Sequence, residues 1–150
     1  MKEKAYKTVQ RVSLRQVCDG RIKFSVNEVD KPIDAFKAVR KYYKGADREM
    51  LSALCLNAHN NPTCFSVLSI GALNMTRTTP REILKVAILS NSESLILFHN
   101  HPSGSLDPSP EDIEFTKGVG KACDLMGIHL YDHLIVTDEG FASLRERGLL

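Results

Sequence analysis

The sequence predicts a single domain of the α/β or α+β class, in which a mixed β-sheet is flanked by helices. The length of 150 residues suits one domain, and 43% hydrophobic residues are enough to build a core. Segments with strand-like and helix-like periodicity alternate along the chain, without an internal repeat, a low-complexity tract or a linker. Interleaved elements of this kind pack as helices on the faces of a sheet.

The first half of the chain predicts a strand, a helix and a hairpin. Apolar and polar residues roughly alternate over residues 6–17, which is typical of a half-buried strand. A helix is expected over residues 32–45, because apolar residues recur there at steps of three and four between a proline and a glycine. Residues 50–70 predict two apolar strands joined by a polar turn at 57–61.

The second half predicts a helix, a buried strand, a longer helix and a further strand. We expect residues 71–79 to form a loop and a helix to begin at Thr79, where a cap is followed by a proline and by Glu82. Residues 94–98 form a short apolar run of the kind found in strands buried on both faces. The remaining expected elements are a helix over residues 109–126, a strand over 128–137, a turn over 138–140 and a short element over 141–150.

Net charge, cysteine usage and hydropathy exclude several classes of protein. The formal net charge is +2 at pH 7, so the composition does not demand a polyanionic partner. The four cysteines are scattered, with no C-x-x-C pair, and we expect free thiols in a reducing compartment. The N-terminus lacks the apolar region of a signal peptide, and no apolar run reaches membrane-spanning length. We therefore expect a soluble cytoplasmic protein without a membrane partner.

Two histidines lie one residue apart at the end of the apolar run. If His99 and His101 occupy the end of a strand, both imidazoles point to one face, with Cα atoms roughly 6.6 Å apart. The proline- and glycine-broken loop that follows returns the chain to a helix near Ser109, which could bring Asp112 to the same place. Two neutral imidazoles and one carboxylate are a common ligand set for catalytic zinc, with the fourth position left for water. Such a water has a lowered pKa and becomes a nucleophile.

The segment 109–112 also has an explanation that needs no metal. A serine cap, a proline at the first helical position and two acids in the first turn are what a helix N-terminus requires by itself. The two interpretations compete, because an Asp112 carboxylate bound to metal is not expected to reach back fully to the cap amide. Two histidines on one face before a broken loop are hard to explain by packing, and they favour the metal site.

The spacing of these residues resembles the signature of the JAMM metalloproteases, also called JAB or MPN-type domains. The matching positions are His99-x-His101-Pro102 and Ser109-x-x-Asp112. The run HNHPSG, with TPREIL upstream and DHLIV downstream, is similar to the RadC family, a bacterial branch of that group. The resemblance extends from about residue 6 to the C-terminus. It implies a JAB/MPN-type, cytidine-deaminase-like fold over residues 1–150.

The resemblance also implies a role for each residue of the site. One zinc ion would be bound by His99, His101 and Asp112, with water as the remaining ligand. Ser109 would help to stabilise the oxyanion of a tetrahedral intermediate. The group uses a glutamate upstream of the histidines as general base, and Glu49 is the expected one, because it stands just before a predicted strand. Glu82 is the alternative, although its place in the first turn of a helix already accounts for it.

The implied activity is zinc-dependent hydrolysis of an amide or isopeptide bond in a peptide or protein substrate. The alternative is a DNA-repair or mobile-element accessory protein that binds nucleic acid or protein, with little or no peptidase activity. Longer relatives carry a helix-hairpin-helix segment ahead of this domain, and we expect none in this chain. Basic residues of the first 44 positions could form a weak polyanion-binding face, but a solvated surface is favoured. They are Lys2, Lys4, Lys7, Arg11, Arg15, Lys37, Arg40, Lys41 and Lys44.

Two other interpretations of the motif are disfavoured. HNH nucleases distribute their three residues over a hairpin and a helix, whereas the three are consecutive here. Non-catalytic scaffolds of the JAB/MPN group have lost ligands that this sequence retains. Downstream, Asp132 and His133 are neighbours in a predicted strand and must point to opposite faces, so only one of them is expected to face the metal. We expect His133 to be structural or to support a ligand rather than to bind the ion.

Overall fold

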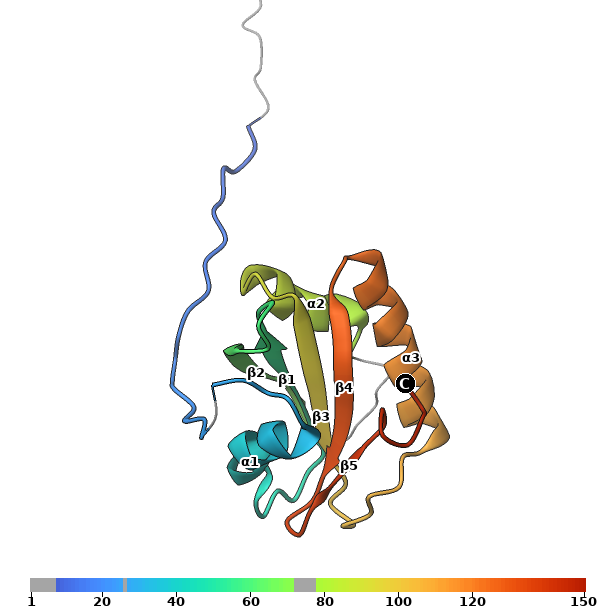
Figure 1. Cartoon of the computed structure of the whole chain (residues 1–150). Coiled ribbons are helices and arrows are strands. Elements are labelled where there is room, and N and C mark those ends of the chain that lie inside the picture. The colour runs from blue at the N-terminus through green and yellow to red at the C-terminus, as the bar shows by residue number, and fades with distance from the viewer. Residues whose placement is uncertain (1–7, 26, 72–77) are drawn as a thin grey trace, which may run out of the picture.

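The computed structural model describes residues 8–25, 27–71 and 78–150. These residues form three helices and five strands, and the strands lie in one sheet in the order β2-β1-β3-β4-β5 (Figure 1). The elements are α1 (Pro32–Tyr43), β1 (Met50–Leu56), β2 (Pro62–Ile70), α2 (Pro80–Leu89), β3 (Ser94–Asn100), α3 (Pro110–Leu125), β4 (His129–Val136) and β5 (Phe141–Ser143). The expected mixed α/β architecture is confirmed.

The sheet is mixed because one connection differs from the others. β3 and β4 are parallel and are joined through α3, whereas the other neighbouring strands are antiparallel. A parallel pair needs a long crossover, which a helix supplies here. The crossover places the N-terminus of α3 near the end of β3 at which His99 and His101 lie.

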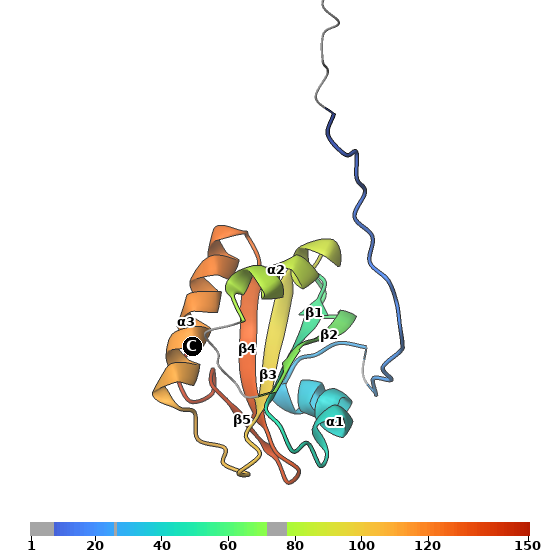
Figure 2. The ribbon, with the colours of Figure 1, turned by 180° about the vertical axis from the view of Figure 1, so that it is seen from behind.

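Helices cover both faces of the sheet, and the side chains of the central strands alternate between them. On one face, α1 packs against Met50, Leu54, Ile96 and Phe98. On the other face, α2 and α3 pack against a second cluster that includes Ala53. Figure 2 shows α2 and α3 together on this side. β1 and β3 are buried along their whole length, which explains why apolar residues fill most of their positions instead of alternating with polar ones.

The expected elements from residue 32 onwards are confirmed, with small differences at their ends. α3 runs unbroken through its two glycines, and a Cβ on Gly120 would lie 3.8 Å from the side chain of Leu130, so the helix packs closely on β4 there. Gly127, with φ of +68°, follows the end of the helix in a left-handed conformation that favours glycine. All four cysteines are free.

The strand expected at residues 6–17 is wrong for the part that the structure describes. Residues 8–17 are exposed and carry no strand, and Val9 and Leu14 are 94% and 80% exposed. Figure 1 shows this segment leading away from the sheet. Alternation predicts which side chains a strand would bury, but a strand also needs a neighbour to bond its backbone, and none of the described residues supplies one.

Three expectations fall partly or wholly outside the described residues. They are the beginning of the N-terminal strand, the basic residues Lys2, Lys4 and Lys7, and the middle of the loop at 71–79. None of the described helices is both long and apolar enough to span a bilayer.

Candidate metal centre

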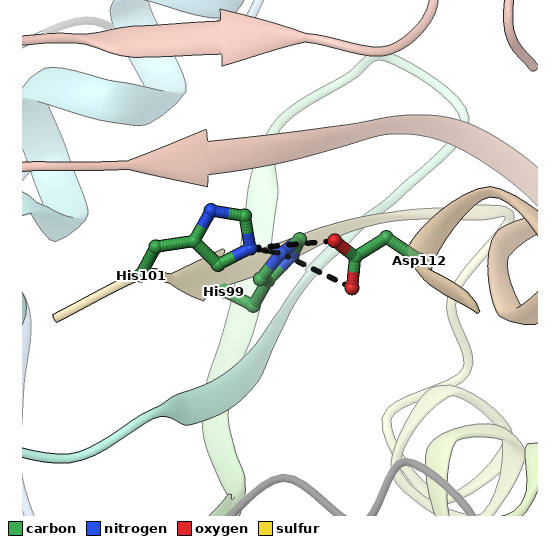
Figure 3. A group of neighbouring side chains, drawn as sticks. All are labelled: His99, His101 and Asp112. Carbon is green, nitrogen blue, oxygen red and sulfur yellow. Dashed lines mark hydrogen bonds and ion pairs between the residues drawn. The ribbon is translucent and has the colours of Figure 1, made fainter. Parts of the chain in front are cut away.

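Three side chains from the end of β3 and the start of α3 gather at one place. His99 is the penultimate residue of β3, His101 follows that strand directly, and Asp112 lies in the first turn of α3. The His99 side chain is fully buried, whereas the side chains of His101 and Asp112 are 15% and 7% exposed. Figure 3 shows the two imidazoles and the carboxylate directed towards one another. The three residues could hold a metal ion.

The distances between the candidate ligand atoms fit a tetrahedral zinc site. Nε2 of His99 lies 3.0 Å from Nε2 of His101, and the two nitrogens lie 3.5 and 3.3 Å from the nearer carboxylate oxygens of Asp112. Two ligands at about 2.0–2.1 Å from zinc, with a tetrahedral angle between them, lie about 3.3 Å apart. The two distances to Asp112 involve different oxygens, so small rotations of these groups would complete the site.

A buried chain of hydrogen bonds fixes the position of the proton on His99. Thr116 Oγ1 lies 2.6 Å from the main-chain oxygen of Asp112, which can only accept, so the hydroxyl must donate to it. The same hydroxyl lies 2.6 Å from Nδ1 of His133 and therefore accepts a proton from that nitrogen. Nε2 of His133 is then bare, and it accepts from Nδ1 of His99 at 2.8 Å. Nε2 of His99 is left with a lone pair that is available to a metal.

The same reasoning applies to His101. Its Nδ1 lies 3.0 Å from the main-chain oxygen of Ser105, so Nδ1 donates and Nε2 carries the lone pair. The bare nitrogens of the two histidines therefore face each other at 3.0 Å. Two lone pairs at this distance repel, unless a proton or a metal ion lies between them. The donor set and its protonation therefore fit a divalent cation.

The surroundings of Asp112 keep its carboxylate charged. Burial would raise the pKa of Asp112. When a proton rather than a metal ion lies between the two imidazoles, the hydrogen bond and charge interaction with protonated His99, together with the bonds from Ser109, outweigh burial and hold that pKa well below its ordinary value. Burial, followed by the charge of His99, holds the pKa of His133 well below its ordinary value, so His133 is neutral, as the hydrogen-bond chain requires. An anionic carboxylate and neutral imidazoles are the forms that bind metals.

The carboxylate of Asp112 also serves as a helix cap. Its Oδ2 accepts from the main-chain N–H of Ser109 at 2.8 Å, and Oγ of Ser109 accepts from the N–H of Asp112 at 3.1 Å. The cap thus forms while the carboxylate also faces the two imidazoles, and the expected competition between capping and ligation stays a prediction about the metal-bound form. The carboxylate has two oxygens, so Oδ2 bonds the cap while Oδ1 faces His99. The capping box holds the carboxylate in the position from which it could also bind a metal ion.

Of the expected catalytic residues, Ser109 bonds to the cluster through Asp112, and the roles of Ser109, Glu49 and Glu82 stay predictions. Ser109 is the N-cap of α3, and its bond from Asp112 uses an oxygen lone pair, which leaves the hydroxyl proton to be donated. Glu49 is half-buried, directly precedes β1, and accepts a main-chain hydrogen bond from Gly71 at 3.0 Å. Glu82 lies in the first turn of α2 and pairs with Lys85 at 2.7 Å.

His133 bonds to the candidate ligand His99, and Asp132 faces elsewhere. Asp132 accepts from the Ser143 hydroxyl at 2.5 Å and from the main-chain N–H of His133 at 2.7 Å. The adjacent pair therefore does not form a carboxylate–imidazole bond. Sequence analysis missed Thr116, although its place four residues after Asp112 on one helix face was a usable signal. It also missed Asn100, which stands between the two histidine ligands.

One hollow on the described part of the molecule reaches the cluster, and a larger one does not. A hollow of about 280 Å³ is lined by His101, Asn100 and the turn at residues 137–139. A larger hollow of about 700 Å³ lies between β2 and residues 16–24 and contains none of the three candidate ligands. The smaller hollow is the one from which a bound molecule could reach the candidate ligand atoms.

The fold and the histidine–histidine–aspartate cluster together define a JAB-type domain. The family model described as "RadC-like JAB domain" matches residues 29–149, and the chain belongs to this family. The match begins after the segment at residues 6–17, so the resemblance expected from residue 6 is confirmed only from residue 29 onwards.

Several curated bacterial proteins are similar to this chain. A UPF0758 protein of Shouchella clausii is 45% identical over 120 residues, which cover 80% of this chain and 52% of that protein. UPF0758 proteins of Desulforamulus reducens and Clostridium kluyveri are each 43% identical over 119 residues, which cover 79% of this chain and 52% of each relative. The chain thus spans about half the length of these relatives, and their names state no reaction.

Proposed function

We propose that the protein is a zinc-dependent hydrolase that cleaves an amide or isopeptide bond in a peptide or protein substrate. The observation that carries the proposal is the convergence of Nε2 of His99, Nε2 of His101 and the Asp112 carboxylate, with both nitrogens left unprotonated by their outer hydrogen bonds. Three protein ligands leave a fourth position for water, as in catalytic rather than structural zinc sites. Free thiols are consistent with a cytoplasmic location.

A zinc ion in this site would supply a bound water of lowered pKa and a Lewis acid for the substrate carbonyl. His99, His101 and Asp112 would hold the ion, with His133 and the capping box fixing their orientation. Glu49 would accept the proton of the attacking water and deliver it to the leaving amine. Ser109 would donate its hydroxyl proton to the carbonyl oxygen as that atom gains charge. The substrate would enter over the hollow that His101 borders.

Metal analysis and a peptidase screen test this proposal. Protein purified without chelators should contain about one equivalent of zinc, and His99→Ala and His101→Ala should lose it. The wild type should hydrolyse at least one member of a panel of peptide and isopeptide substrates, and this activity should disappear on chelation and return with added zinc. A chain that binds no divalent metal would overturn the proposal.

Replacement of Glu49 and of Glu82 by glutamine tests which acid is the general base, because a lost base lowers turnover without lowering the zinc content. Glu49→Gln should retain zinc and lose turnover by roughly 100-fold or more, because proton transfer by a positioned group contributes about 10²–10⁴-fold. Glu82→Gln is the matched control, since Glu82 pairs with Lys85 on the surface, and it should retain activity. Full turnover in Glu49→Gln would exclude Glu49 as the base.

A further inference from the structure

The asparagine between the two histidine ligands bonds to the backbone on both sides of Glu49. The side chain of Asn100 is buried, and the residue is only 4% exposed. Its Oδ1 accepts from the main-chain N–H of Met50 at 2.7 Å, and its Nδ2 donates to the main-chain oxygen of Arg48 at 3.0 Å. The two peptide groups that flank the Cα of Glu49 are therefore held by one side-chain amide.

This clamp continues the β1–β3 ladder beyond its last backbone pair. β1 and β3 are antiparallel, and their register ends at Leu51 opposite His99. The chain then leaves the sheet at Pro102, which has no N–H to donate. The amide of Asn100 presents one acceptor and one donor to the β1 side, as a peptide group would. It thereby fixes the two peptide groups that flank Glu49 at the point where the ladder itself has ended.

The alternation of β1 directs Glu49 to the face of the sheet that carries the metal ligands. Met50 and Leu54 belong to the cluster under α1, and Ser52 bonds to Tyr43 of that helix. The odd-numbered residues of β1 face the other side of the sheet, where α3 packs and where His99 contacts Asp112. Asn100 bonds to Met50 one place beyond the Leu51–His99 pair, and alternation continued by one more residue turns Glu49 to the side of the sheet that His99 faces.

We propose that Asn100 is a positioning residue, which orients Glu49 towards the site that His99, His101 and Asp112 form. The inference rests on the proposed function for the role of Glu49 as base. This positioning role explains why an asparagine, Asn100, stands between the two histidines in the run HNH. His99 and His101 face the ion, and the residue between them faces away and holds the base. One stretch of three residues then arranges two ligands and the general base together.

The experiment compares Asn100→Ala with Asn57→Ala. Asn57 is a matched control, because its Oδ1 also accepts two main-chain N–H groups, those of His59 and Asn61, but in the β1–β2 turn away from the ligands. Asn100→Ala should lower kcat about 100-fold, as expected for a misplacement of about 1 Å, with KM and zinc affinity nearly unchanged. Asn57→Ala should reduce stability and leave kcat close to that of the wild type.

Combination with Glu49→Gln shows whether Asn100 acts through the base. The loss of kcat caused by Asn100→Ala should disappear when Glu49 is already glutamine. An active wild type whose turnover is unaffected by Asn100→Ala, or a loss of the same size in the Glu49→Gln background, would overturn the proposal while leaving the hydrolase function standing.

A spectroscopic readout covers the case in which the wild type hydrolyses none of the substrates. In the wild type, added zinc should shift the side-chain carboxyl ¹³C resonance of Glu49, and in Asn100→Ala this shift should be lost while amide hydrogen exchange at Met50 accelerates. A shift that persists in Asn100→Ala, or unchanged exchange at Met50, would contradict the clamp. An inactive wild type with this response intact would instead count against the proposed function.

Discussion

Replacement of Thr116 by valine should weaken both the fold and the metal site. Thr116 is fully buried, and its hydroxyl bonds to Asp112 and to Nδ1 of His133, at 2.6 Å in each case. Valine keeps the volume but leaves the Nδ1–H of His133 without an acceptor in a place closed to water. An unsatisfied buried donor costs about 1–3 kcal/mol. At about 2–4 °C per kcal/mol for a chain of this size, the variant should melt about 2–12 °C below the wild type.

The loss of this acceptor should also reach the metal through the tautomer of His133. Without Thr116 Oγ1, the proton of His133 is free to move to Nε2, which faces Nδ1 of His99. The proton of His99 would then shift to Nε2, the nitrogen that faces the metal. Loss of such a supporting bond weakens metal binding by about 10–100-fold, which is about 1.4–2.7 kcal/mol.

Calorimetric melting of the apo protein and zinc competition with a chromophoric chelator measure the two effects. Thr116→Ser keeps the hydroxyl and is the matched control, which should bind zinc almost as the wild type does. A Thr116→Val variant that melts and binds zinc like the wild type would refute the hydrogen-bond chain from which the lone pair on His99 Nε2 was inferred.

Three further predictions concern the metal, a thiol and nucleic acid. At a zinc concentration of about 100 times its Kd, bound zinc should add about 2.7 kcal/mol to the free energy of unfolding. Excess chelator should therefore lower the melting temperature by about 5–11 °C in calorimetry. An unchanged melting temperature would contradict a metal site in the folded protein. A hydrogen bond from Cys55 lowers the pKa of Cys64 to about 6, so Cys64 is mostly thiolate above that pH. Iodoacetamide at pH 7 should therefore alkylate Cys64 well before the buried Cys55. Peptide mapping that finds Cys55 modified first would refute this prediction. The chain should not be retained on duplex DNA even at low salt, and strong salt-dependent retention would revive the nucleic-acid alternative.

Much of the fold was predictable because local signals and burial agree in it. The mostly apolar runs of β1 and β3 follow from burial on both faces, and the proline and acids at the start of α3 mark its first turn. That residues 8–17 form no strand was not predictable in this way. Their alternation is a local property, whereas a strand exists only if another segment bonds to its backbone, and the sequence does not say which segment that would be.

The candidate ligands could be predicted because the period of two in a strand sets His99 and His101 on one face. The residues that support them could not, because their contacts cross the fold. His133 comes from β4 and Thr116 from α3, and their meeting beside His99 depends on the parallel β3–β4 pairing. The capping role of Asp112 was predictable, but the direction in which each of its two oxygens points was not.

Anomalous diffraction at the zinc edge, from crystals grown with one equivalent of zinc, tests the central claim most directly. We expect a single strong peak about 2.0–2.2 Å from Nε2 of His99, Nε2 of His101 and a carboxylate oxygen of Asp112, with density for water at the fourth position. A peak at any other place, or coordination of either histidine through Nδ1, would contradict the account.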